Sequence, residues 1–291
     1  MKKKLKILMI GAHFDDNDFR GGGTALKYIR EGHTVRFLVV CDGTMGHHEM
    51  APGDIHKRRM EEAAKVSDIT GIEYDNMGLP ECDFEADREN RKQMVRYIRE
   101  YQPDIIFTHR TNDYHVDHRN VALLVQDASY LLIIPHYCPE VAALKETPVI
   151  MYFCDKFTNP EFRPDIVIPI DDVIDKKYDM YNCYESQVYE WLPFTKGVLE
   201  QIPSDPAERL EWLRSPRVPR DGRLLTEDEM DIFIASNNSE YRDALPAVKY
   251  REKIVERYGK EARGTLFAEA FQVSEYGKRL TEKNAAELFP F

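Results

Sequence analysis

The sequence predicts an α/β fold in which helices cover both faces of a mainly parallel sheet. Short apolar runs, typical of buried strands, alternate with longer segments whose apolar residues recur at helical spacing. This alternation is typical of right-handed βαβ units, which set successive strands parallel to one another. The chain has 291 residues, 43% of them hydrophobic, so a sizeable core can form beneath a charged surface.

Strands are expected where a short apolar run is bounded by glycine, proline or charged residues. These runs are 5–10, 35–40, 104–108, 148–154, 165–169 and 265–273. Helices are expected where the apolar spacing is helical, at 24–30, 55–69, 87–101, 120–132, 171–191 and 247–258. The glycines at 21–23 are expected to interrupt the chain before the first helix, and Gly32 and Gly71 to end the first two.

The character of the chain changes after Pro193, where the strand–helix alternation is lost. We expect a Rossmann-like catalytic core over 1–192 and a C-terminal extension over 193–291 that packs on the core and helps to shape the pocket. A single domain over 1–291 is the alternative. Residues 203–223 are rich in Pro, Arg, Asp and Glu, which predicts a surface excursion or lid.

Composition excludes several classes of protein. The formal net charge is −11, which argues against non-specific binding to nucleic acid or to an anionic membrane. No apolar run approaches the roughly 20 residues of a membrane span, and the run at 7–12 is short for a signal peptide. The five cysteines are scattered without a Cys-x-x-Cys pair, which fits a reducing compartment. A cytoplasmic location is expected, and a homo-oligomer is left open.

Two polar clusters follow expected strands, at 11–18 and at 109–118. Ligands of open α/β sheets bind outside the carboxyl ends of the strands, so both clusters lie where a site is expected. Three of the nine histidines fall within the second cluster. Acids and histidines at this density are costly to bury without a metal ion or a hydrogen-bond network.

Histidine and aspartate are zinc ligands, and catalytic zinc sites commonly use three protein ligands and a water. His13 and Asp16 lie three apart in a tight turn and can reach one ion, which His118 completes from the second loop. Asp15 can accept a proton from the water, and His115 can stabilise an oxyanion or protonate the leaving amine. The alternatives are that the first acids only cap a helix and that the second cluster is a solvated loop. Fe²⁺ or Mn²⁺ could replace zinc.

At these residues the sequence resembles the PIG-L/LmbE-like family of zinc-dependent N-deacetylases. The segment 12–18, Ala-His-Phe-Asp-Asp-Asn-Asp, is similar to the family motif Ala-His-Pro-Asp-Asp-x-Glu, and 115–118 matches His-x-Asp-His. The resemblance implies a Rossmann-like fold and hydrolysis of an N-acyl group, usually acetyl, from an amino sugar or its conjugate. It also implies roles for six residues: His13, Asp16 and His118 as ligands, Asp15 as general base, His115 as oxyanion or acid residue, and Asp117 as the residue orienting it.

Weaker similarities to the family occur at residues expected to bind the substrate. Arg59 corresponds to an arginine that faces the substrate in the family, and Thr44 and Asp18 are expected near it. The sequence departs from the family at three positions: Phe14 replaces a proline, Asp18 a glutamate, and Thr44 a frequent glutamate. Two other functions are weighed against the deacetylase. One is a nucleotide-binding α/β enzyme, although the first turn lacks Gly-x-Gly-x-x-Gly, and the other is a metal-binding relative without catalysis.

Overall fold

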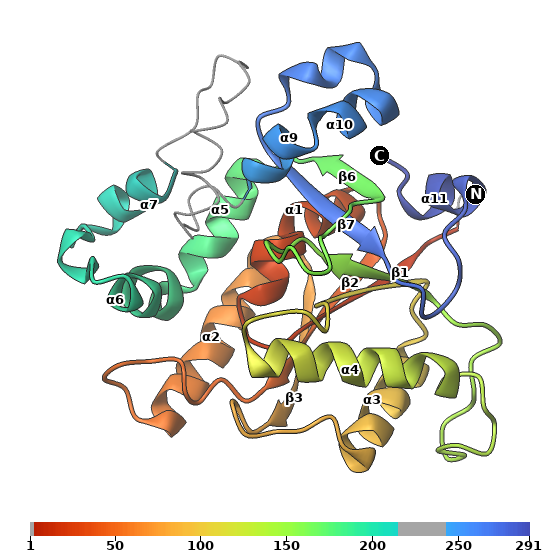
Figure 1. Ribbon diagram of the computed structural model, residues 1–291. Helices are drawn as coiled ribbons and strands as arrows, with labels where there is room; N and C mark the ends of the chain where they lie inside the picture. The colour runs from red at the N-terminus through yellow and green to blue at the C-terminus, as the bar shows by residue number, and fades with distance from the viewer. Residues whose placement is uncertain (1–2, 215–242) are drawn as a thin grey trace.

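The computed structural model of the protein describes residues 3–214 and 243–291, and a seven-stranded sheet lies at its centre (Figure 1). The strand order is β3-β2-β1-β4-β5-β7-β6. The strands are β1 (Lys6–Gly11), β2 (Thr34–Cys41), β3 (Glu73–Leu79), β4 (Ile105–Thr108), β5 (Val149–Phe153), β6 (Ile166–Pro169) and β7 (Ala268–Val273). Strands β1 to β5 pair in parallel, and β7 is antiparallel to both β5 and β6. The predicted α/β fold with a mainly parallel sheet is confirmed.

Helices cover both faces of the sheet, as the sequence predicts (Figure 1). The main ones are α1 (Asp16–Arg30), α2 (Pro52–Thr70), α3 (Arg88–Tyr101), α4 (Val116–Leu131), α5 (Ile174–Cys183), α7 (Pro206–Arg214), α9 (Leu245–Lys249), α10 (Arg251–Tyr258) and α11 (Glu282–Leu288). A π-helix, η1 (Ser186–Trp191), and the short α6 (Leu192–Thr195) follow α5, and 3₁₀ turns lie at η2 (Leu199–Gln201) and η4 (Lys260–Gly264). No helix in the described part of the chain is long and apolar enough to cross a bilayer.

Two hydrophobic cores result from the alternation of side chains along the central strands. Ile7 and Met9 of β1 pack toward α1, α2 and α5, whereas Leu8 and Ile10 pack toward α3 and α4. All four side chains are fully buried. A strand that is buried on both faces reads as a continuous apolar run, which is why β1, β2, β4 and β5 were predictable from the sequence.

The expected interruption at the glycines 21–23 is wrong, because α1 runs from Asp16 to Arg30 without a break. These glycines allow the helix to approach its neighbours closely. A Cβ atom at Gly21 would lie 2.8 Å from the Met9 sulfur, and one at Gly23 would lie 2.8 Å from Cγ2 of Ile170. The three-glycine segment therefore serves helix packing on the sheet.

Other differences lie at element ends and in polar segments. Helix α4 begins at Val116 instead of residue 120, and the expected helix 171–191 divides into α5 and the π-helix η1. Strand β3 and helix α11 were not expected, and β3 is a half-exposed edge strand of mixed polarity. Residues 206–214 of the expected surface excursion form α7, and its end at 215–223 lies outside the described residues. The division into 1–192 and 193–291 stays a prediction.

A buried ionic network joins the late strand β7 to the first helix. Lys177 is fully buried, and its Nζ lies 2.5 Å from Oδ1 of Asp243 and 2.5 Å from Oε1 of Glu269. The Glu269 carboxylate also accepts the N–H groups of Gly23 and Thr24 in α1, at 2.8 and 2.7 Å. One ammonium group thus compensates two buried carboxylates that hold α1, α5 and β7 together.

Replacing Lys177 by methionine should strongly destabilise the fold, because two buried carboxylates lose their counter-ion. Breaking one side of a buried ion network costs about 3–5 kcal/mol. Urea unfolding measures this loss, and Lys176→Met is the matched control, since the Lys176 side chain is 44% exposed. The surface change should stay within about 0.5 kcal/mol of the parent. Equal unfolding midpoints for the two variants would show that the network does not stabilise the fold.

Candidate active site and metal centre

A pocket of about 210 Å³ opens at the carboxyl edge of the central strands. The turn after β1, the loop after β2, the end of β3, the loop before α4 and the π-helix η1 line it. A larger hollow of about 1060 Å³ lies among residues 3–5, 102–104 and 142–149 at the opposite edge. Among the described residues, every group of histidine, cysteine and aspartate side chains that could hold a metal ion includes a residue lining the smaller pocket, and none includes a residue lining the larger hollow. We therefore assign the chemistry to the smaller pocket.

The Asp16 carboxylate closes the turn between β1 and α1. Its Oδ2 atom accepts the backbone N–H groups of Ala12 at 3.0 Å and of His13 at 2.8 Å. Gly11 is needed for this close turn, because a Cβ atom there would lie 2.8 Å from Cβ of Asp16. The turn brings Nδ1 of His13 to 3.4 Å from the same Oδ2 atom. His13 and Asp16 thus meet as the sequence predicts.

His118 reaches this pair from the first turn of α4. Its Nε2 atom lies 3.3 Å from Nδ1 of His13 and 3.4 Å from Oδ1 of Asp16. Ligands bound to zinc at about 2.1 Å with tetrahedral angles are about 3.4 Å apart. Each of these pairwise distances is close to that spacing, with Oδ2 of Asp16 facing His13 and Oδ1 facing His118. The donor set of two imidazoles and one carboxylate suits a catalytic metal.

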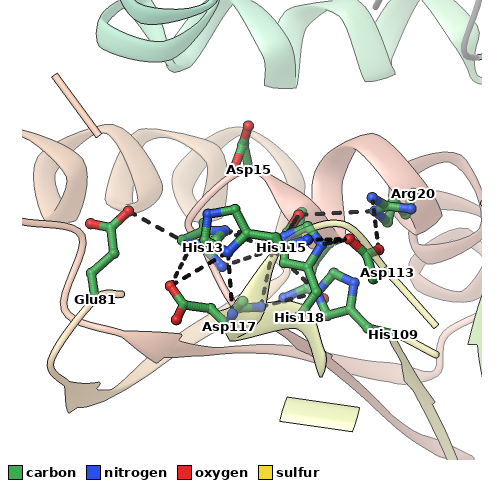
Figure 2. A network of polar contacts seen from close by, with 12 residues as sticks. His13, Asp15, Arg20, Glu81, His109, Asp113, His115, Asp117 and His118 are labelled. Atoms are coloured by element: carbon green, nitrogen blue, oxygen red, sulfur yellow. Dashed lines mark hydrogen bonds and ion pairs between the residues drawn. The ribbon is translucent and has the colours of Figure 1, made fainter. Parts of the chain in front are cut away.

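Neighbouring carboxylates orient both imidazoles, as Figure 2 shows. Oδ2 of Asp117 lies 3.1 Å from Nε2 of His13, and Oδ1 of Asp113 lies 3.1 Å from Nδ1 of His118. Each contact uses the ring nitrogen opposite the one that faces the proposed ion, the usual arrangement for histidine ligands. Asp117 was expected to orient His115, but its Oδ2 is 3.7 Å from Nδ1 of His115 and closer to His13.

His109 is a pocket neighbour to which the sequence assigned no role. Its Nε2 atom lies 3.2 Å from Oδ2 of Asp16, and its ring stacks on that of His118 at 4.0 Å. Asp16, His109 and His118 form one group whose ligand atoms lie within 4.8 Å of one another, and His13, His115 and His118 form another. The position of His109 in the sequence could have indicated this role, because His109 directly follows a buried strand and so lies at the carboxyl edge of the sheet.

Charges alternate through this cluster and shift the pKa values. Burial would raise the pKa of Asp16, but His118 and His109 hold it well below its ordinary value. Burial would lower the pKa of His13, but the hydrogen bond to Asp117 and the charge of Asp16 raise it well above the ordinary value. Burial, with the charge of His118, lowers the pKa of His109 to about 3.

His115 stands as the N-cap of α4 beside the three proposed ligands. Its Nδ1 atom accepts the backbone N–H of Asp117 at 3.2 Å, and its ring centre lies 4.6 Å from that of His13. Burial and the charges of His13 and His118 lower the pKa of His115 to about 4. The ring is therefore neutral near pH 7, with Nε2 as its N–H donor, and it can donate a hydrogen bond more readily than a full proton.

Asp15 lines the same pocket and projects away from the polar network, as labelled in Figure 2. Its Oδ2 atom accepts a hydrogen bond of 2.8 Å from Nε2 of Gln187 in the π-helix. The Gln187 Oε1 atom in turn accepts from Arg59. Arg59 is only 4% exposed, yet no carboxylate lies within ion-pair distance of it among the described residues. Asp15 and Arg59 thus lie on the same wall of the pocket, and the side-chain amide of Gln187 links them. No role for Gln187 was predicted from the sequence.

The structure places two expected substrate residues away from the pocket lining. Asp18 is fully buried, and its carboxylate accepts the Tyr74 hydroxyl at 2.5 and 2.6 Å, while burial raises its pKa well above the ordinary value. The Thr44 hydroxyl donates to Oδ1 of Asp42 at 2.8 Å. Neither lines the pocket. Two residues that do line it, Glu81 and Cys82, were missed because the preceding edge strand β3 was not expected.

Comparison with protein families confirms the resemblance that the two motifs suggested. Residues 8–129 match the PIG-L family, described as GlcNAc-PI de-N-acetylase, and this segment includes both polar clusters. A 4-oxalmesaconate hydratase from Pseudomonas putida is 25% identical over 202 residues, which are 67% of this chain and 78% of that protein. A diacetylchitobiose deacetylase from Thermococcus kodakarensis is 26% identical over 205 residues, 66% of this chain and 76% of that protein.

Solved structures share the fold. The N,N'-diacetylchitobiose deacetylase from Pyrococcus horikoshii matches with a TM-score of 0.64 and 19% identity, over 92% of this chain and 83% of that one. The 4-carboxy-2-hydroxymuconate hydratase from Pseudomonas putida KT2440 matches with a TM-score of 0.63 and 21% identity, over 96% of this chain and 99% of that one. At these identities the match establishes the fold alone.

Replacing His118 by alanine should reduce the affinity for a divalent ion by at least about 100-fold, because even a residue that only supports a metal ligand is worth 10–100-fold. Metal analysis after dialysis against buffered zinc measures the change. The control is His136→Ala, since His136 is exposed and remote from the pocket lining. Unchanged zinc content in the His118 variant would place the ion elsewhere.

Proposed function

We propose that this chain is a zinc-dependent hydrolase that removes an N-acyl group, usually acetyl, from an amino sugar or its conjugate, and the match of residues 8–129 to the PIG-L family supports this proposal. The observation that carries the proposal is the convergence of His13, Asp16 and His118, each pair of which has nitrogen or oxygen atoms 3.3 to 3.4 Å apart, on the wall of a pocket that Asp15 also lines. The name of the Thermococcus relative, a diacetylchitobiose deacetylase, supports the substrate class.

The proposed mechanism follows from these positions. His13, Asp16 and His118 would hold a divalent ion, which would supply Lewis acidity and lower the pKa of a water molecule. Asp15 accepts the proton of the attacking water and passes it to the leaving amine. His115 donates its Nε2 hydrogen to the carbonyl oxygen as negative charge develops there. Asp117 and Asp113 hold the His13 and His118 rings in position. Zinc suits this donor set, and Fe²⁺ or Mn²⁺ also binds such sites.

The turn after β1 disfavours the alternative of a nucleotide-binding enzyme. In such enzymes the backbone N–H groups at this turn receive the phosphates. Here the Asp16 carboxylate already takes the N–H groups of Ala12 and His13. An anion is therefore built into the position that a phosphate would need.

A second candidate function is hydration of an unsaturated carboxylic acid. Two guanidinium groups, those of Arg20 and Arg59, line the pocket and can bind carboxylates. The Pseudomonas putida relative is named a hydratase of oxalmesaconate, which supports this candidate. Both reactions would use an activated water, so the substrate separates them.

Asp15→Asn should retain metal and lose about 10²- to 10⁴-fold in kcat, because the amide cannot accept the proton of the attacking water. Release of free amine from N,N'-diacetylchitobiose measures kcat, and metal analysis measures the zinc content. Asp68→Asn is the control, since Asp68 is an exposed carboxylate that does not line the pocket. A fully active Asp15→Asn variant would rule out Asp15 as the base.

A substrate panel should distinguish the two candidate reactions. Acetate and free amine should appear from N-acetylglucosamine conjugates, and the absorbance of conjugated unsaturated dicarboxylic acids should not change. If the acids are hydrated and the amides remain intact, the hydratase candidate replaces the deacetylase. His118→Ala should abolish whichever activity is found.

A further inference from the structure

Cys82 occupies an unusual position in the pocket wall. It is an exposed residue with φ +65°, a left-handed conformation that costs a non-glycine residue about 1–2 kcal/mol. Its backbone N–H donates to Oδ2 of Asp117 at 3.0 Å, which fixes the backbone beside that carboxylate. The chain thus holds a thiol at the pocket surface in a conformation that glycine would adopt without strain.

The thiol does not stand alone. Cys82, His115 and Asp117 each offer a ligand atom within 4.8 Å of the other two. Asp117 is fully buried, and its Oδ1 atom receives no hydrogen bond from a nitrogen or oxygen of the described residues. Glu81 adds negative charge, since its Oε1 atom lies 3.7 Å from Nε2 of His13. A thiol, an imidazole and one carboxylate therefore meet beside the pocket, and the Glu81 carboxylate lies close by, next to His13.

We propose that Cys82, His115 and Asp117 form a second cation site for a thiophilic divalent ion such as Zn²⁺ or Cd²⁺. It adjoins the site of His13, Asp16 and His118 and shares none of its ligands. Binding replaces the thiol proton, which leaves to solvent, and forms a metal–sulfur bond. Ions that prefer oxygen ligands, such as Mg²⁺, should not bind there.

The second ion should bind more weakly than the first and should inhibit the enzyme. Binding must displace the thiol proton, and coordination through Nδ1 of His115 would break its hydrogen bond with the Asp117 N–H. His115 and Asp117 would then be engaged by the ion. The predicted inhibition rests on the proposed function, in which His115 and Asp117 support catalysis. The predicted binding of the second ion does not depend on that function.

Cobalt spectroscopy tests the site directly. Co²⁺ titrated into protein that already carries one equivalent of Zn²⁺ should produce a thiolate-to-cobalt charge-transfer band in the near ultraviolet. Cys82→Gly should lack the band, while keeping the backbone N–H and relieving the strain. Cys41→Ala is the matched control, because Cys41, His13 and Asp117 form another group that could bind a metal ion. The charge-transfer band should persist in this variant.

The outcomes separate the site from its consequence. A band that persists in Cys82→Gly, vanishes in Cys41→Ala or never appears overturns the proposed site. In the activity assay, half-inhibition of Cys82→Gly should need at least 10-fold more Zn²⁺ than half-inhibition of the parent. If the Cys82-dependent band is present and neither deacetylase nor hydratase activity exists, the cation site stands and the proposed function fails.

Discussion

The pocket depends on one carboxylate, that of Asp16, which closes the turn between β1 and α1. Its oxygens accept two backbone N–H groups and lie next to three imidazoles, those of His13, His109 and His118. Because these groups come from two separate loops, the position of Asp16 fixes how the loops meet. Their convergence follows from the sheet, since β1 and β4 are parallel neighbours whose carboxyl ends share one edge.

Around this carboxylate, cationic and anionic groups alternate. Asp117 contacts His13, and Asp113 contacts His118 (Figure 2). The Asp16 carboxylate contacts both imidazoles. The His13 and His118 rings thus each have a carboxylate on either side, and these contacts hold the rings in position. A site built in this way is ordered before an ion arrives, so little conformational entropy is lost on binding.

Much of the fold was predictable from the sequence, as was the meeting of the two polar clusters at one edge of the sheet. Buried strands such as β1 give continuous apolar runs, and the two polar clusters lie at the ends of β1 and β4. Strand β3 was missed because an edge strand with one exposed face carries a weak apolar signal. Because β3 was missed, Glu81 and Cys82, which follow it and line the pocket, were not predicted as site residues. The contacts of Gln187 with Asp15 and Arg59 depend on a π-helix, and no local sequence signal predicts which side chains it brings together.

The antiparallel strand β7 lies between β5 and β6, and it comes almost a hundred residues after β6 in the chain. Until it arrives, β5 is an open edge and β6 has no partner among the described strands. Loop closure over this distance is slow compared with pairing of neighbouring strands. The five parallel strands can therefore assemble during synthesis, while the far side of the sheet must wait until β7 has been synthesised. An unpaired edge in that interval is open to association with other nascent chains.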